Sequence, residues 1–305
     1  MRKFNKESLT IEEQLDLLIK RNLIVNNYDS AISILKRIGY YHLSSYMRLF
    51  QEGDNHKFSD NVSFNQLHDL YKFDQELRHI TFKAIEKIEI AYRVAISNYM
   101  CKNFGSHWFY NKECFRKDED LEKSLEIIKK EIKKKDDEYA ETFIANYYKK
   151  YSEPDLPPFW MVAETLTIGS LNRLYQMLDW NSKREIVKYL GFQENIKIIS
   201  SSNWLFALSV IRNICAHHSR LFNRIFRIAP TVPDKILEFK NTFNNRFYYI
   251  SMVINFYLIT ISNDNSFEND LKKLFDEYKN IDITKLGFPK DWETFSITNI
   301  KKVKL

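Results

Sequence analysis

The sequence predicts an all-α protein. Its 305 residues contain only six glycines and six prolines, whereas a many-stranded β protein needs such turn residues far more often. Apolar residues make up 44% of the chain, and in many stretches they recur at the three- and four-residue spacing of an amphipathic helix. The length suits one large domain or two smaller ones.

The first helices are marked by their ends. Thr10 and Glu13 form a potential capping box ahead of a helical apolar pattern. Beyond it the sequence predicts a helix over 30–37 that stops at Gly39, and a further helix that begins at residue 40. A polar loop is expected over 53–61. The helical pattern resumes at Phe64 and is strongest over 74–100.

The second half of the chain has clearer breaks. Residues 117–140 are rich in Lys, Asp and Glu and indicate a solvated helix face or a hairpin, and the prolines at 154, 157 and 158 indicate an extended segment. The pattern then predicts helices over 159–178, 182–189 (closed by Gly191), 202–226 (stopped by Pro230 and Pro233), 235–261 and 266–278.

Composition narrows the possible classes of protein. Cys101, Cys114 and Cys215 contain no CxxC pair, so we expect reduced thiols in a cytoplasmic protein and neither a disulfide framework nor a zinc site. The N-terminal residues lead into an amphipathic segment and not into the apolar centre of a signal peptide. The most apolar run, 247–261, is shorter than the ~20 residues that span a membrane, so a buried helix is expected.

The predicted helix over 202–226 has an unusual polar face. Its apolar side carries Trp204, Leu208, Ile211 and Cys215, while Asn213, His217, Arg220 and Arg224 fall on the other side. Between 195 and 233 there is no Asp or Glu, and the cations are Lys197, Arg212, Arg220, Arg224 and Arg227. Arginines without acidic partners favour an anionic ligand, and phosphate matches the guanidinium fork.

Three side chains on this helix suit phosphate chemistry. Asn213 and His217 are four residues apart and therefore neighbours on the helix surface, with Arg212 to one side. Histidine transfers protons near neutral pH, and arginine stabilises charge on phosphate oxygens. Spacing alone favours phosphate binding over catalysis, because a single histidine on a helix is more often structural.

A longer match adds to this pattern. The run Arg212-Asn213-Ile214-Cys215-Ala216-His217 resembles the R-N-x-x-x-H motif of HEPN ribonucleases. The whole segment 211–224 resembles, more narrowly, the Abi-like abortive-infection family of bacterial phage defence (the AbiD/AbiF type). Further segments similar to this family are 35–44, 71–93, 157–166 and 286–292. Phe222 stands where the family usually has Trp, which is an apolar position outside the proposed chemistry.

The resemblance implies a fold and a domain division. It implies a HEPN-like helical bundle core over 63–230, with a charged insertion around 117–140. An N-terminal helical segment over 1–62 and a C-terminal helical segment over 231–305 would flank this core.

The resemblance also implies an activity. Arg212, Asn213 and His217 would catalyse RNA cleavage without a metal or other cofactor, in a toxin acting in phage defence, and two motifs would meet across a homodimer. The alternative is a non-catalytic RNA-binding protein that holds a small non-coding RNA or another partner. A metal-dependent nuclease has no support, because no Asp/Glu/His group has ligand spacing.

Supporting residues are expected on two helices. Glu86, Glu89 and Arg93 share a face of the 74–100 helix. One alternative is a surface pair of Glu89 with Arg93, worth about 0.3–0.5 kcal/mol. The other is that Glu86 or Glu89 faces the arginine-rich helix and sets Arg212 or the tautomer of His217. Arg220 and Arg224 are expected to bind flanking RNA phosphates or to pair with those glutamates. His218 falls toward the apolar side and is expected to be structural.

An aromatic cluster follows Gly39. Tyr40, Tyr41, His42 and Tyr46 are candidates for stacking on RNA bases, although core packing is the expected role for most of them.

Overall fold

A computed structural model describes residues 7–53, 55–133, 142–193, 199, 203–232 and 245–292. The prediction of an all-α protein is confirmed, since the described residues contain a single two-stranded sheet beside the helices. The helices and strands are α1 (Ile11–Lys20), α2 (Tyr28–Ile38), α3 (Tyr40–Met47), β1 (Gln51–Glu52), β2 (Lys57–Phe58), α4 (Phe64–Phe104), α5 (Asp118–Lys133), α6 (Thr142–Lys150), α7 (Phe159–Thr165), α8 (Ile168–Met177), α9 (Trp180–Tyr189), α11 (Trp204–Ala216), α12 (Phe247–Ser262) and α13 (Ser266–Glu277). Short 3-10 turns lie at Trp108–Tyr110, Lys112–Cys114 and Ile283–Leu286.

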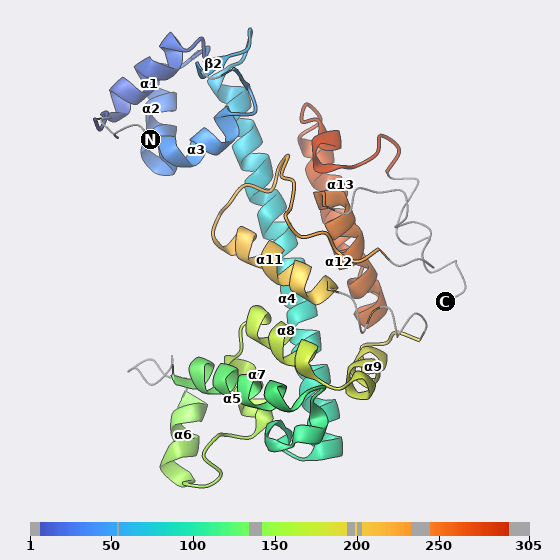
Figure 1. The fold of residues 1–305 in the computed structure, drawn as a ribbon. Helices are drawn as coiled ribbons and strands as arrows, with labels where there is room; N and C mark the ends of the chain where they lie inside the picture. The colour runs from blue at the N-terminus through green and yellow to red at the C-terminus, as the bar shows by residue number, and fades with distance from the viewer. Residues whose placement is uncertain are drawn as a thin grey trace.

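Helix α4 is the central element of the fold. Its 41 residues correspond to a rod about 60 Å long. It begins at a capping box formed by Ser63 and Gln66. Helices α7, α9, α11, α12 and α13 all pack against it (Figure 1). The strong helical pattern over 74–100 is therefore the middle of one longer helix.

The N-terminal segment packs at the start of α4. The capping box of Thr10 and Glu13 is present at α1, and Gly39 separates α2 from α3 in a left-handed conformation (φ 83°). The prediction of a loop over 53–61 was partly wrong, because Lys57 and Phe58 pair with Gln51 and Glu52 in an antiparallel ladder. The cause is the buried Phe58 side chain, which draws this polar stretch onto the core.

The predicted helix over 159–178 is two helices. Leu166 is extended (ψ 136°), and the Thr167 side chain accepts a hydrogen bond from the Ser170 amide to cap α8. The apolar spacing that continues across this junction concealed the break.

The predicted helix over 202–226 is wrong in its second half. Helix α11 ends at Ala216, and its end is a Schellman motif in which the His218 amide donates to the Cys215 carbonyl and the Ser219 amide to the Ile214 carbonyl, both at 3.0 Å. His218 takes the left-handed conformation (φ 56°) that this motif requires. Residues 217–232 then form a non-helical segment, which we call the post-motif segment.

The C-terminal helices cover α4 from one side. Helix α12 begins at Phe247, so the predicted start at 235 lies outside the described residues. Helix α13 agrees with the predicted range to within one residue. Nearly every side chain of α12 is buried, as expected for the most apolar run of the chain. Within the described ranges, no helix combines the length and apolar character needed to cross a membrane.

A buried carboxylate joins α3, α4 and the post-motif segment. Asp74 of α4 has no exposed surface and accepts hydrogen bonds from the Tyr46 hydroxyl at 2.7 Å and from Arg78 Nη1 at 2.5 Å. It also accepts the backbone amide protons of Leu221 (3.1 Å) and Phe222 (2.7 Å). We call this arrangement the Asp74 clamp. It holds the backbone that follows the motif.

The Asp74 clamp makes a large contribution to stability. We expect Asp74→Ala to lower the free energy of unfolding by about 3–5 kcal/mol, because it leaves Arg78 buried without its carboxylate partner. Asp69→Ala is the matched control on the same helix, where an exposed pair with Lys72 contributes about 0–1 kcal/mol. Urea unfolding of both variants measures the difference, and equal losses would show that the clamp adds no stability.

Candidate functional site

The motif lies at the exposed end of α11. Arg212 and Asn213 lie near the C-terminal end of this helix, and His217 is the first residue after it. The His217 amide donates to the Asn213 carbonyl at 2.9 Å, so the two residues remain neighbours although the helix ends between them. Both side chains are exposed, while Arg212 is half-buried. A ligand in solvent can therefore reach all three.

Glu89 of α4 lies next to Arg212. Its Oε2 atom is 4.0 Å from Arg212 Nε, and its Oε1 atom accepts a hydrogen bond from Arg93 Nη2 at 3.0 Å. Arg93 also donates to the Leu166 carbonyl at 3.2 Å, at the break between α7 and α8, and pairs with Glu164 at 3.8 Å. One carboxylate thus lies between two guanidinium groups, and the motif arginine is one of them.

The guanidinium of Arg212 is held between neighbouring side chains, and its Nε donor is buried. It lies over the Phe82 ring, with Cζ 5.2 Å from the ring centre. Within the part of the chain that the structure describes, its Nε has no hydrogen-bond partner. A buried donor without an acceptor is costly. Because Nε itself is buried, a phosphate in solvent can reach only the more exposed part of the half-buried guanidinium.

The two predicted glutamates have different environments. Burial raises the pKa of Glu89 above its ordinary value, while the charges of Arg93 and Arg212 act in the opposite direction. Glu86 is exposed, and its charge adds a further small rise to the pKa of Glu89. The structure brings Glu89 and Arg93 to the motif and leaves Glu86 on the solvent side of α4.

Arg220 and Arg224 lie on the post-motif segment and not on the helix face expected from the sequence. Burial lowers the pKa of Arg220, and the nearby Asp74 and Tyr46 oppose this effect. Arg224 Nη1 donates to the Arg220 carbonyl at 3.2 Å. Among the described residues, neither arginine pairs with Glu86 or Glu89, and Nη1 of Arg220 is buried without a hydrogen-bond partner.

Two further histidines lie near the motif. Helix α3 contributes His42, whose ring packs against those of Tyr46 (6.4 Å) and Tyr71 (5.7 Å). Burial lowers the pKa of His42, and the charges of Arg78 and His218 lower it further. His218 itself is exposed and shapes the helix end through its left-handed backbone.

Several residues of this site were not identified from the sequence. They are Asp74, Arg78 and Phe82 of α4. The i,i+4 spacing of Asp74 and Arg78 is a usable signal for a pair. Nothing in the local sequence shows that the acceptor of the pair also binds backbone amides far along the chain.

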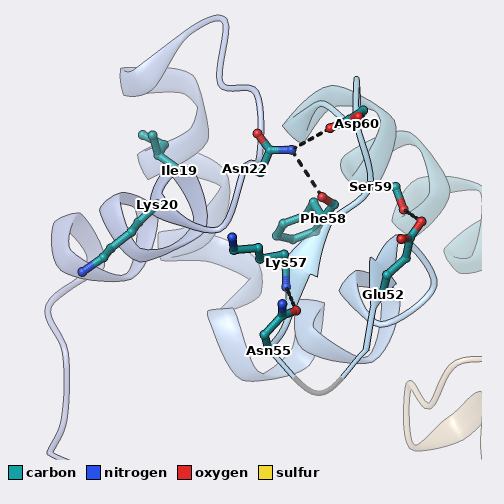
Figure 2. Close-up of a pocket in the computed structure, with 9 residues that line it drawn as sticks. All are labelled: Ile19, Lys20, Asn22, Glu52, Asn55, Lys57, Phe58, Ser59 and Asp60. Atoms are coloured by element: carbon teal, nitrogen blue, oxygen red, sulfur yellow. Dashed lines mark hydrogen bonds between the residues drawn. The ribbon is translucent and has the colours of Figure 1, made fainter.

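Two of the hollows in the described structure lie beside segments of interest. A cavity of about 440 Å³ lies between α11 and the post-motif segment, lined mainly by apolar side chains together with Arg224 and Arg227. A polar pocket of about 550 Å³ lies in the N-terminal segment between the end of α1 and the β1–β2 hairpin (Figure 2). Its acidic side chains already accept hydrogen bonds, Asp60 from Asn22 at 3.3 Å and Glu52 from Ser59 at 2.8 Å.

Metal-ligating side chains do not gather in the described ranges. No group of three or more His, Cys, Asp or Glu side chains there is arranged to hold a metal ion.

Fold and site together define a class: an all-α protein whose exposed Arg-Asn-His motif is supported from a long central helix by a buried glutamate. The chain belongs to the Abi-like protein family, whose model matches residues 33–223, well over half of its length. The matched range includes the aromatic cluster of α3, the Asp74 clamp and the whole motif. Searches of curated proteins and of solved structures found no match.

The raised pKa of Glu89 predicts a pH-dependent difference in stability. Above its ordinary pKa of 4.5, the folded protein retains a proton on Glu89 that the unfolded chain has released, so the wild type loses stability as pH rises through this window. In Glu89→Gln this titration is absent. We therefore expect the unfolding free energy of the wild type, minus that of Glu89→Gln, to fall as pH rises from 4.5 and then to level off.

Urea unfolding of both proteins at a series of pH values measures this difference, and the remaining carboxyl groups cancel in the subtraction. A difference that grows with pH would mean that Arg93 and Arg212 outweigh burial at Glu89.

Proposed function

We propose that this protein is a HEPN-type endoribonuclease that cleaves RNA without a metal ion and acts as a toxin in abortive infection. The observation that carries the proposal is the contact between Glu89 and Arg212, which holds a half-buried guanidinium beside the exposed Asn213 and His217. A phosphate contact, an amide and an imidazole are thereby available at one place. Membership of the Abi-like family supports the role in phage defence.

In the proposed reaction, the RNA 2′-oxygen attacks the adjacent phosphorus atom. His217 of one chain removes the 2′-hydroxyl proton as the new P–O bond forms, and an acid protonates the 5′-oxygen as its bond to phosphorus breaks. The products are a 2′,3′-cyclic phosphate and a 5′-hydroxyl. Arg212 stabilises the charge that grows on the non-bridging oxygens, and Asn213 orients His217 or the phosphate.

The second proton-transfer group is proposed to be His217 of another copy of the chain. Phe206, Val210, Asn213 and His217 recur at three- and four-residue intervals and share one face of α11. Phe206 is 45% exposed, and Ile225, which lines the cavity from the post-motif segment, is 62% exposed. Apolar side chains that continue a motif face into solvent suit a two-fold contact that brings two motifs together.

A non-catalytic role in holding a small RNA is the second candidate. Arg220, Arg224 and Arg227 lie on the post-motif segment, where they suit phosphate binding without any proton transfer. The two candidates differ in one respect, because only cleavage requires the imidazole of His217.

Replacing His217 tests cleavage directly. We expect His217→Ala to lower the rate of RNA cleavage by about a hundredfold to ten-thousandfold. His79→Ala, which removes an exposed histidine paired with Glu76 on α4, is expected to cleave at the wild-type rate. The measurement is cleavage of end-labelled single-stranded RNA, with product ends identified by mass spectrometry.

Two further conditions sharpen the same assay. Cleavage is expected to persist in excess chelator and to stop at a nucleotide that carries 2′-deoxyribose. A His217→Ala protein that cleaves at the wild-type rate would refute the assignment. Wild-type protein that binds RNA but never cuts it would favour the second candidate.

The proposed dimer has its own test. We expect Phe206→Glu to shift the protein from dimer to monomer in analytical ultracentrifugation and to reduce cleavage in parallel, because a charge is introduced on the shared face. Ile19→Glu changes an equally exposed apolar residue, 43% against 45%, on α1, and it should leave the dimer intact. A Phe206→Glu protein that remains dimeric would place the contact elsewhere.

A further inference from the structure

The aromatic cluster after Gly39 contains one residue without a packing role. Tyr40 accepts a hydrogen bond from Arg21 at 2.8 Å, Tyr46 is buried in the Asp74 clamp, and His42 packs against two tyrosine rings. Tyr41, in contrast, is 91% exposed. The cluster thus divides into three side chains that fix α3 and one ring that is presented to solvent.

The position of Tyr41 is fixed relative to the motif. Helix α3 is anchored through Tyr46 to Asp74, and Asp74 binds the amides of the post-motif segment. On that helix the charge of His218 contributes, after burial and Arg78, to lowering the pKa of His42. Tyr41 directly precedes His42, so its exposed ring is carried by the helix that the Asp74 clamp joins to the segment following the motif.

The surroundings of Tyr41 are polar. On α3 its neighbours one turn away are Ser44 and Ser45, whose hydroxyls donate to the carbonyls of Tyr41 and His42. Exposed Arg48 follows one turn later, next to His56 at 2.8 Å. The ring is therefore not the centre of an apolar patch of the kind that protein partners bury. A single aromatic face with hydroxyl groups and a cation nearby suits a nucleobase and its phosphate.

We propose that Tyr41 is a stacking platform for a base of single-stranded RNA bound at the motif. The inference rests on the RNA-binding part of the proposed function, but it does not require cleavage. It assigns to α3 a part in substrate binding: Arg212 would contact the phosphate, and Tyr41 would hold a base a short distance along the same strand.

Binding to uncut RNA tests this assignment. All variants are made in the full chain carrying His217→Ala, and the probe is a fluorescein-labelled single-stranded RNA of about 12 nucleotides, within the range of a single-strand binding site. The variants are Tyr41→Ala, Tyr41→Trp and the control Tyr151→Ala. Tyr151 is 56% exposed and directly follows α6, at the opposite end of the molecule from α3 (Figure 1).

Fluorescence anisotropy gives the dissociation constants. Tyr41→Ala is expected to weaken binding by about fivefold to 150-fold, the loss of one stacked base. Tyr41→Trp should bind as tightly as the parent, and Tyr151→Ala should have no effect. RNA that carries 5-iodouridine should form a photo-crosslink mapping to Tyr41 by mass spectrometry. Circular dichroism shows whether each variant is folded.

The outcomes for stacking and for cleavage are separable. If Tyr41→Ala binds RNA as tightly as its parent, or if no protein of the series binds the probe, the stacking assignment is overturned. If RNA binding depends on Tyr41 while otherwise unmodified protein never cuts RNA, the stacking assignment stands and the proposed ribonuclease activity fails. If cleavage proceeds but Tyr41→Ala and Tyr151→Ala bind equally well, only the stacking assignment fails.

Discussion

The Asp74 clamp is the interaction on which the rest of the site depends. A carboxylate without solvent contact is strongly unfavourable unless its oxygens are satisfied, and here they accept bonds from Tyr46, Arg78 and two backbone amides. The clamp fixes α3, α4 and the post-motif segment at one point. Helix α11 packs against α4, α8 and α12, and the clamp fixes the chain that follows its exposed end at His217. The backbone that follows the motif is therefore positioned by Asp74, a residue outside the proposed chemistry.

Helix α4 also contributes Glu89, the second buried carboxylate of the site. Asp74 and Glu89 have different effects. Asp74 binds backbone amides and positions the chain, whereas Glu89 lies between Arg93 and Arg212 and positions the side chain proposed to bind phosphate. Since both belong to one continuous helix, their separation is fixed by helix geometry. Phe82 lies between Asp74 and Glu89 in the sequence, and the guanidinium of Arg212 packs over its ring. The motif arginine is thus oriented by one charge and one aromatic face, while part of its guanidinium stays exposed.

The sequence predicted the helices well and their interruptions poorly. Apolar periodicity located α1, α4 and α13, because it depends only on which face is buried. It missed the ends at Leu166 and at His218, where single residues leave the helical conformation while the apolar spacing continues. Of the candidate site, Arg212, Asn213, His217, Glu89 and Arg93 were identified from spacing and resemblance. Asp74 and Phe82 were not, because their roles arise from contacts between distant segments.

The distance in sequence spanned by the Asp74 clamp has a consequence for the order of folding. The amide of Leu221 lies 147 residues beyond the carboxylate that binds it. Helix α4 is stabilised by local hydrogen bonds and can form soon after it is synthesised, but the clamp must wait for the loop to close. A ribosome therefore has to extend the chain past Phe222 before the motif acquires its final geometry. Until that point the nascent chain contains the long helix without the surface that α11 adds to it.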